Sequence, residues 1–568
     1  MTMLVLAAVT AFSFGDVKVE CGNPGPWTIR SERAEVEKGV ETLKLTLDAP
    51  AAAVPPRFEV YWKIPQVDIS NTWAVNEPAC SLRPNWGGWK YSALSYHMPL
   101  YVYFNGNDRS RFAVAASECV HHLAFCGGIL EEGCFVESKL VYFDSVEAPM
   151  THYETEIRFD TRDRFFGDAV RDGVKWMEES SGLRPCVAPA AAFDPLYSSW
   201  YDFHQDLRAA DVEAECALAA KLGMKVIILD DGWQTDDTNR GYAFCGDWQV
   251  SKKRFPDFAA HVAKVQAMGM KYMVWYSVPF VGFKSVNYAR FKGKYLREDA
   301  NQQAAVLDPR FPEVRKFLVD TYVDAVKAAN LDGLKLDFIN SFSFDGKDPA
   351  EAEGYAGRDV KSVPLAVDRL MTEVRTALVA LKPDILIEFR QPYNGPAIRT
   401  YGNMLRVGDC PGDMRQNRVS IANMRLASGE SAVHADMLEW NFKDTPASAA
   451  RNIINSIFGV VQYSVMLREA PPEHLAMIGK WIRFSQDHRD TLLKGEFRPR
   501  HPELMYPVIE AESADELIIG VYDDGRVIDV PSDKKTFLMN ATGVDRLVIR
   551  RGGKLSEIAC PSGDWVEL

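Results

Sequence analysis

The stretch Val226-Ile-Ile-Leu-Asp-Asp-Gly-Trp233 places four apolar residues directly before two adjacent carboxylates. A continuous apolar run is typical of a parallel strand that helices cover on both faces. Asp230 and Asp231 cannot be buried without partners, so we expect them at the carboxyl end of this strand. Ligands bind at that end of the sheet in α/β folds. The stretch therefore predicts a strand of a parallel sheet and the edge that carries a functional site.

The residues around this strand alternate between strand-like and helix-like segments. Helical text includes residues 211–222, 258–268 and 312–329, the last with apolar residues along one side. Eight strand-helix units favour a (β/α)₈ barrel, which we place at residues 190–495. The predicted barrel strands are residues 196–201, 224–229, 271–278, 333–336, 385–389, 404–407, 432–435 and 460–465.

Short strands with polar and apolar alternation flank the barrel on both sides. Residues 1–185 contain many such runs between Gly, Pro and Asn turns, which predicts an antiparallel β-sandwich. A linker rich in Ala and Pro follows at residues 185–195, and residues 497–568 predict a small all-β domain. The expected fold class is a multidomain α/β protein made of sandwich, barrel and small β domain.

The composition is that of an ordinary globular protein, with 47% hydrophobic and 25% charged residues and a net charge of −13. This charge disfavours nucleic acid or an anionic membrane as the main partner. No stretch approaches the roughly 20 apolar residues of a membrane span. The ten cysteines are scattered and include no Cys-x-x-Cys pair, which predicts mostly reduced, buried thiols and a cytoplasmic location.

The apolar N-terminal run, residues 3–14, has two interpretations. It resembles a secretion signal in hydrophobicity, but no Lys or Arg precedes Lys18 and the run is short. A first β-strand is the simpler prediction.

Charged and aromatic side chains stand at the carboxyl ends of the predicted barrel strands. A single Asp in such a place is as readily a helix cap or a turn residue, but repetition along six strands favours a site. Converging carboxylates suit cleavage of a glycosidic bond, in which one acts as nucleophile and another as proton donor. The aromatic residues Trp200, Trp233 and Tyr276 are expected to stack on a pyranose ring. The strand-end residues are Trp200, Asp202, Asp230, Asp231, Tyr276, Lys335, Asp337, Glu388, Arg390, Arg406, Asp409 and Asp436.

Several motifs in this region resemble glycoside hydrolase family 36, the α-galactosidase and raffinose-synthase group of the retaining clan that also holds family 27. They are Leu229-Asp-Asp-Gly-Trp233, Gly246-Asp-Trp248, Leu307-Asp308 and Leu334-Lys-Leu-Asp-Phe338. The resemblance covers about residues 190–490, and the flanking β domains fit the family's layout. It implies a retaining, exo-acting α-glycosidase, α-galactosidase-like, that works by double displacement with two Asp residues.

The resemblance also implies residue roles. Asp337 would be the nucleophile, with Lys335 beside it holding a substrate hydroxyl, and the pair Asp230 and Asp231 would contact the O4 and O6 region of the sugar.

The acid/base is less clearly marked. The segment Arg406-Val-Gly-Asp409 resembles the one that carries it, which points to Asp409. We expect the nearby charge of Asp337 to raise the pKa of Asp409, and the two carboxyl groups to lie about 5–6 Å apart. A different alignment selects Asp413, although that residue is better explained as a cap of the following helix.

One loop departs from the family pattern. Arg390-Gln-Pro-Tyr-Asn-Gly395 stands where a Cys-x-x-Gly-rich loop usually contacts the 2-position of the sugar. Arg390, Gln391 and Asn394 can bind hydroxyls, but they need not select galactose.

Three other functions compete with this hypothesis. A transglycosylase of the raffinose-synthase type would use the same residues, whereas a non-catalytic carbohydrate-binding protein would be expected to have lost a carboxylate. A metal-dependent hydrolase would need clustered ligands, and the ten His residues include no His-x-His or His-x-x-x-His pair. We therefore expect an oligosaccharide or glycoside substrate, no cofactor and no metal, and leave a homo-oligomer open.

The sandwich contributes one further candidate feature. Trp73, Trp86 and Trp89 lie in loop-like text, where exposed rings are costly unless they cover something. One of them could reach over the barrel mouth, or all could pack a domain interface.

Overall fold

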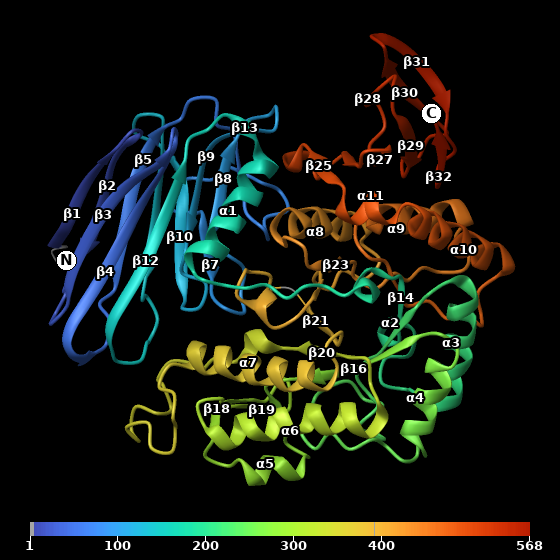
Figure 1. Ribbon diagram of the computed structural model, residues 1–568, viewed down its shortest axis with the longest axis horizontal. Helices are drawn as coiled ribbons and strands as arrows, with labels where there is room; N and C mark the ends of the chain where they lie inside the picture. The colour runs from blue at the N-terminus through green and yellow to red at the C-terminus, as the bar shows by residue number, and fades with distance from the viewer. Residues whose placement is uncertain (1–4, 391) are drawn as a thin grey trace.

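The computed structural model describes residues 5–390 and 392–568 (Figure 1). A β-sandwich in blue and cyan stands beside a barrel that runs from green to orange, and red strands form a third part above the barrel. The predicted fold class is confirmed by these sheets and their strand order.

The sandwich consists of two antiparallel sheets, with strand orders β1-β2-β5-β11-β10-β7 and β3-β4-β12-β9-β8-β6. Trp62 and Leu45 are fully buried between them. The predicted first strand is present as β1. The strands are β1 (Val5–Phe12), β2 (Gly15–Cys21), β3 (Thr28–Glu37), β4 (Val40–Ala53), β5 (Phe58–Pro65), β6 (Asn71–Trp73), β7 (Trp89–Ser92), β8 (Leu100–Phe104), β9 (Arg109–Ala116), β10 (Leu123–Leu130), β11 (Phe135–Tyr142), β12 (Met150–Asp160) and β13 (Arg164–Phe165), which pairs with β9.

The barrel contains the eight predicted strands in parallel order β23-β22-β21-β20-β16-β15-β14-β24, and a bridge between His434 and Val460 nearly closes the circle. The predicted end of the first strand, residue 201, is wrong. The strand stops at Ser198, and Trp200 begins a short helix, α2 (Trp200–Phe203). The strands are β14 (Leu196–Ser198), β15 (Val226–Leu229), β16 (Lys271–Ser277), β20 (Gly333–Asp337), β21 (Leu386–Arg390), β22 (Met404–Arg406), β23 (Ala432–His434) and β24 (Gln462–Tyr463).

Helices surround the barrel, and α6 (Pro312–Ala329) has the predicted bounds. Its buried side carries Val314, Leu318 and Val326. A small sheet of β17 (Phe280–Gly282), β18 (Tyr295–Asp299) and β19 (Ala304–Leu307) is inserted before α6. The other helices are α3 (Ala209–Leu222), α4 (Phe258–Gln266), α5 (Val286–Arg290), α7 (Val363–Leu381), α8 (Met414–Ala427), α9 (Pro446–Ser456), α10 (Pro472–Asp487) and α11 (Arg489–Lys494), with 3₁₀ turns η1 (Ala190–Phe193), η2 (Ile339–Ser341) and η3 (Ile398–Thr400).

The C-terminal part pairs five strands in one sheet and three in another. They are β25 (Glu496–Arg500), β26 (Val508–Glu512), β27 (Glu516–Val521), β29 (Lys535–Asn540) and β32 (Asp564–Glu567), then β28 (Val527–Val530), β30 (Arg546–Arg551) and β31 (Lys554–Ala559), with the turn η4 (Pro502–Leu504) before β26.

The sandwich and the barrel share apolar contacts. Helix α1 (Phe166–Ser180) packs on β8 and β9 of the sandwich and also contacts α8 of the barrel. One buried apolar cluster runs from sandwich residues such as Trp73 through the barrel to Tyr506. The sandwich is therefore held against the barrel at α8, the helix that follows β22.

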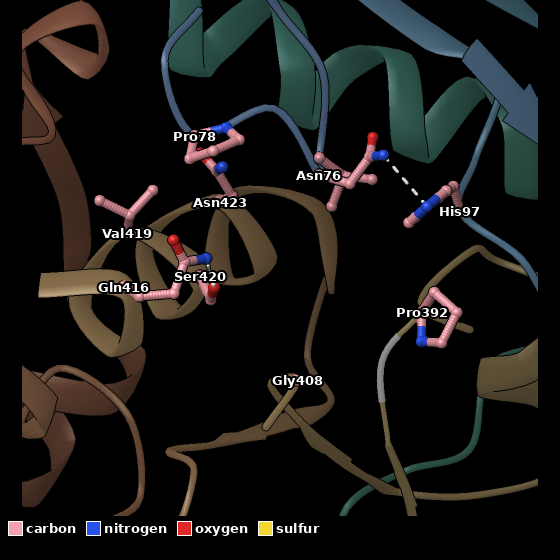
Figure 2. Close-up of a pocket in the computed structure, with 10 residues that line it drawn as sticks. Asn76, Pro78, His97, Pro392, Gly408, Gln416, Val419, Ser420 and Asn423 are labelled. Carbon is pink, nitrogen blue, oxygen red and sulfur yellow. Dashed lines mark hydrogen bonds between the residues drawn. The ribbon is translucent and has the colours of Figure 1, made fainter. Parts of the chain in front are cut away.

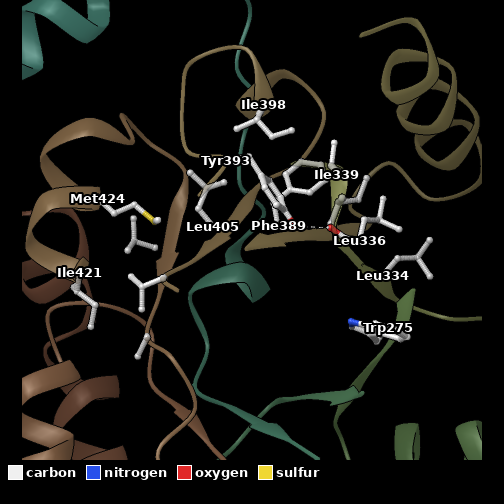
Figure 3. Packing of buried hydrophobic residues seen from close by; sticks show 14 of the residues in the cluster. Trp275, Leu334, Leu336, Ile339, Phe389, Tyr393, Ile398, Leu405, Ile421 and Met424 are labelled. Atoms are coloured by element: carbon white, nitrogen blue, oxygen red, sulfur yellow. Dashed lines mark hydrogen bonds between the residues drawn. The ribbon is translucent and has the colours of Figure 1, made fainter. Parts of the chain in front are cut away.

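The interior of the barrel changes in polarity from one end to the other. Apolar residues at the strand beginnings, among them Val226, Met273 and Leu386, fill the amino end. On β20, Leu334 and Leu336 belong to the large apolar cluster (Figure 3). The alternate residues Lys335 and Asp337 point the other way and line the pocket at the carboxyl end. This two-residue alternation places the charged side chains of β20 together.

Two further expectations concern the whole chain. All ten cysteines are free and eight of them are buried, as predicted. No helix in the described part of the chain combines the length and the apolar composition needed to cross a membrane.

Candidate active site

A pocket at the carboxyl ends of the barrel strands brings together eight of the predicted site residues. They are Trp200, Asp230, Asp231, Lys335, Asp337, Arg390, Arg406 and Asp409, and three further residues, Tyr242, Trp275 and Phe338, also line it.

Asp337 is the most firmly held carboxylate of this pocket. One oxygen, Oδ2, accepts a hydrogen bond from Trp275 Nε1 at 3.1 Å. The other, Oδ1, accepts from Arg390 Nε at 2.9 Å and from the backbone N–H of Phe338 at 2.7 Å. Burial opposes its ionisation, but the positive charges of Arg390, Lys335 and Arg406 outweigh burial and hold the pKa of Asp337 well below its ordinary value. Asp337 is therefore a buried, ionised and oriented carboxylate.

The backbone after Asp337 is strained. Phe338 has a φ of 64°, in the left-handed region that non-glycine residues rarely occupy. This conformation accompanies the hydrogen bond from the Phe338 N–H to the Asp337 side chain. Strain of this kind clusters at functional sites.

Arg390 lies between the two candidate catalytic carboxylates. Its Nε binds Asp337, and its Nη1 is 3.8 Å from Asp409 Oδ2. The pocket itself measures only about 40 Å³, far less than the roughly 300 Å³ at which small-molecule sites begin. A pyranose therefore needs side chains to move, and Arg390 occupies the space between the carboxylates.

Asp409 stands at the pocket mouth with about half of its side chain exposed. Arg406 Nη2 donates to its Oδ1 at 2.8 Å. Burial raises its pKa, and Asp337 raises it slightly further, but Arg406 and Arg390 outweigh both and lower the pKa of Asp409 below its ordinary value. The expectation of a raised pKa for Asp409 is therefore wrong for this arrangement, because the two arginines lower this pKa by more than burial and Asp337 raise it.

The paired carboxylates at the end of β15 have different partners. Asp230 accepts from Lys335 Nζ at 2.6 Å, in a buried ion pair. Asp231 accepts from the amides of Gln205 and Gln234, and burial raises its pKa to about 6. Lys335 therefore binds Asp230 directly, and its charge also lowers the pKa of Asp337 on β20.

Arg406 is paired with the buried carboxylate of Asp436. The two form a buried ion pair, and Asp436 also accepts from Tyr201 Oη at 2.8 Å. Asp436 is fully buried and, like Asp202, is not among the residues that line the pocket. Asp436 therefore supports Arg406 and does not contact the pocket itself.

Trp233 and Tyr276 lie behind the pocket wall. Both are almost fully buried, and their rings pack against each other at 5.3 Å between centroids. Trp275 and Tyr276 are neighbours on β16, so they point to opposite faces, and it is Trp275 that reaches the pocket. The predicted stacking of Trp233 and Tyr276 on a sugar is not supported, and Trp275 takes the place nearest to Asp337. Ser277 is the sequence signal for this orientation. It is a polar residue two positions after Trp275, which indicates that both residues face the inside of the barrel.

The unusual loop after β21 is described in part. Gln391 lies outside the described residues. Asn394 is 1% exposed, does not line the pocket, and both polar atoms of its side chain lack a partner among the described residues. Its predicted contact with a sugar hydroxyl remains a prediction.

Asp413 has a structural role. Its side chain accepts from the Gln416 N–H at 2.9 Å and so caps α8, and it lines a different groove. The expected cap is confirmed, and Asp409 is the acidic residue of this segment that reaches the pocket.

None of the three sandwich tryptophans lines the pocket. Trp73 is buried at the junction, where its Nε1 lies 3.0 Å from Asn423 Oδ1 and 3.2 Å from Tyr506 Oη. Trp86 and Trp89 are exposed. Trp73 therefore packs the interface, as one of the two expectations had it, and a contact of Trp86 or Trp89 with the sugar stays a prediction.

One group of potential metal ligands was found among residues 5–390 and 392–568. Asp108, His501 and Glu503 approach one another where the sandwich meets the C-terminal part. None of them lines the pocket.

Residues 193–389, which include Asp230 and Asp337, match the family model described as melibiase. These residues form a melibiase-type domain. The α-galactosidase Mel36A of Lactobacillus acidophilus is 28% identical over 202 residues, which cover 34% of this chain and 26% of that protein. The α-galactosidase C of Emericella nidulans is 27% identical over 160 residues, covering 25% of this chain and 21% of that protein. The matched parts thus span about a quarter of these curated relatives.

The fold extends the likeness beyond the melibiase-type domain. The structure of the GH36 α-galactosidase AgaA of Geobacillus stearothermophilus superimposes with a TM-score of 0.65 at 14% identity, covering 97% of this chain and 82% of that one. A structure of AgaA in complex with raffinose superimposes with a TM-score of 0.66 at 15% identity, over the same shares of the two chains. The sandwich, barrel and C-terminal sheets therefore share the fold of these two structures.

Proposed function

We propose that this protein is a retaining, exo-acting α-glycosidase of the α-galactosidase type. The observation that supports this most is the pairing, in one pocket of the barrel, of the buried ionised Asp337 with the half-exposed Asp409. Two carboxylates in these settings suit a nucleophile and a proton donor. The relatives named α-galactosidases support the choice of sugar.

In this proposal Asp337 attacks the anomeric carbon of the terminal sugar while Asp409 donates its proton to the departing oxygen. The resulting glycosyl ester is then hydrolysed by water, which Asp409 deprotonates, so the α-configuration is retained. Trp275 and the Phe338 N–H orient Asp337 before the attack.

Substrate entry moves Arg390 in this mechanism. The sugar displaces the guanidinium from between the carboxylates, which frees an Asp337 oxygen and takes one positive charge away from Asp409. Loss of that charge raises the pKa of Asp409 and favours its protonated, donating form.

The remaining pocket residues bind the sugar in this proposal. Asp230 and Lys335 face the hydroxyls as a rigid ion pair, with Asp231 beside them. Trp200 offers a partly exposed ring at the mouth. Arg406 positions Asp409.

A panel of nitrophenyl α- and β-glycosides tests the proposal. We expect α-galactoside cleavage to exceed that of every β-glycoside, and nuclear magnetic resonance should show the α-anomer as the first product. Release from no α-glycoside, or a β-anomer formed first, would refute it.

A further inference from the structure

The cavity next to the catalytic pocket is neutral. It measures about 250 Å³ and lies between a sandwich loop and helix α8 (Figure 2). No Asp, Glu, Lys or Arg is among its described lining residues. Its polar lining residues are Asn76, His97, Gln416, Ser420 and Asn423. This neutral cavity offers no charge to an ionic ligand.

A larger cavity lies at the other end of the barrel. It measures about 490 Å³, which falls within the range of about 300–1,000 Å³ typical of small-molecule sites. Phe193, Ser431 and Val460 line it, and these residues precede the barrel strands β14, β23 and β24. The catalytic pocket is at the carboxyl ends of the strands, so this cavity is at their amino ends. The end of α11 and the start of β25 complete its walls.

Arg425, in the last turn of α8, brings a positive charge to this amino-end cavity. Its side chain is mostly buried and donates to three backbone carbonyl groups, those of Phe458 at 2.9 Å, Leu493 at 2.9 Å and Leu492. Its guanidinium carbon also lies 4.2 Å from the centre of the Phe497 ring. These contacts satisfy its donors, but no carboxylate in residues 5–390 and 392–568 forms an ion pair with it. The charge of Arg425 is therefore not neutralised by a nearby anion.

A second arginine adds to this positive charge. Arg171 lines the same cavity, and its Nη1 donates to the carbonyl oxygen of Phe497 at 3.1 Å, so both arginines contact Phe497. Burial and the charge of Arg171 lower the pKa of Arg425 to about 9, which leaves it charged near pH 7. Two like charges around one cavity repel each other, and an anion between them would offset this repulsion.

The other charged residues of the lining do not cancel this excess. Lys494 lines the cavity, as do the acidic residues Glu430 and Glu496. Glu496 already forms an ion pair with Arg498, which is not among the lining residues. Three cations therefore face two acids, one of which has a partner outside the cavity.

Ser431 provides an independent sign of a ligand. It is 7% exposed, and its hydroxyl has no hydrogen-bond partner in the part of the chain that the structure describes. A buried hydroxyl without a partner costs about 1–3 kcal/mol. A ligand oxygen in the cavity would remove this cost.

We propose that this amino-end cavity binds a small organic anion. Its carboxylate or phosphate group pairs with Arg425 and Arg171 and accepts from the Ser431 hydroxyl, because charge-assisted hydrogen bonds from arginine to such oxygens are among the strongest in proteins. Its apolar part contacts Phe193, Val433 and Val460, which line the same cavity. The site is separate from the catalytic pocket and does not depend on the proposed function.

Calorimetric titration of the full chain tests the site with three probes of similar size. They are phenyl phosphate, phenylacetate and the neutral benzyl alcohol, all at one ionic strength. We expect at least one anion to bind with a Kd of about 1 mM or less and benzyl alcohol to bind at least tenfold more weakly. The anion that binds more tightly identifies phosphate or carboxylate as the preferred group. Binding of neither anion, or equal binding of benzyl alcohol, would overturn the inference.

Two variants locate the binding. Arg425→Gln removes the unpaired charge and should raise the Kd of the anion about tenfold or more. Because Arg425 also holds backbone carbonyls, Val187→Glu is the second variant. Val187 is 82% exposed and lines the cavity, so a carboxylate there should weaken anion binding at least severalfold without disturbing the fold.

Each variant has a matched control outside the cavity. Arg415→Gln changes another arginine of α8, which lines a different groove, and Val54→Glu adds a carboxylate at an exposed valine of the sandwich. We expect both controls to bind the anion as the wild type does. An unchanged Kd in Arg425→Gln and Val187→Glu, or an equal loss in the controls, would overturn the inference.

Discussion

The two cavities on either side of Arg390 and Asp409 differ in size and in charge. The catalytic pocket is small, about 40 Å³, and crowded with paired ions, whereas the neighbouring cavity is larger, about 250 Å³, and neutral. Buried ions are tolerated only when they are paired and hydrogen-bonded, and the ion pair of Asp230 with Lys335 and that of Asp337 with Arg390 meet this condition. The charged groups of the small pocket suit the proposed bond cleavage, whereas the larger cavity offers neutral hydrogen-bonding groups.

The largest effect is expected from Asp337→Asn. The variant keeps the size and polarity of the side chain but removes the nucleophile, so we expect kcat on nitrophenyl α-galactoside to fall by on the order of 10⁴-fold or more. Steady-state assays measure the loss, and circular dichroism checks the fold. In Asp337→Ala, which vacates the space of the side chain, added azide should restore part of the activity and yield the inverted β-galactosyl azide. Activity within tenfold of wild type would remove the nucleophile role.

Asp409→Asn is expected to have a large effect that depends on the leaving group. Loss of a general acid costs about 10²–10⁴-fold when the leaving group needs a proton, so disaccharide cleavage should fall by this amount. Cleavage of α-galactosyl fluoride should fall much less. The control is Asp413→Asn, which keeps a good helix cap, and both of its rates should stay near wild type. Equal losses on the two substrates in Asp409→Asn would argue against a proton donor.

Arg390→Gln is expected to shift the pH profile. Arg390 is one of the two cations that lower the pKa of Asp409. Removing a positive charge raises the pKa of a nearby carboxyl group, so Asp409 stays protonated to higher pH. We expect the basic limb of the kcat/KM profile to move upward by about one pH unit.

The same variant should also move the acidic limb upward, because Arg390 is the first of the three cations that lower the pKa of Asp337, while Lys335 and Arg406 remain and limit that shift. A basic limb that stays fixed or moves downward would show that Arg390 does not control Asp409.

The barrel and most of its site could be predicted because strand ends converge wherever a parallel barrel closes. The apolar run before Asp230 identifies its strand, and the same topology brings Asp337 and Asp409 into one pocket. The order of the motifs along the chain was sufficient to predict that these carboxylates share one pocket.

Other parts of the site depend on geometry that sequence patterns do not carry. Trp275 and Tyr276 are adjacent aromatics, and only the pleat of β16 decides which faces the pocket. Tyr242 arrives from the long loop after β15, and Arg390 reaches Asp337 through a side-chain conformation. The neutral cavity was not predicted, because its walls come from the sandwich and from α8, and Asn76 and Gln416 are 340 residues apart in the sequence.

The smallest effect concerns stability at the junction between the sandwich and α8. Trp73→Phe keeps an aromatic ring in the buried junction but removes the indole N–H that donates to Asn423 Oδ1. Tyr506 still donates to that oxygen, so no acceptor is stranded. We expect the free energy of unfolding to fall by about 1–2 kcal/mol, from the lost hydrogen bond and the smaller ring. Trp89→Phe, on an exposed strand of the same sandwich, should change it by less than about 0.5 kcal/mol. Urea denaturation measures both, and equal changes would mean that Trp73 does not fasten the sandwich to α8.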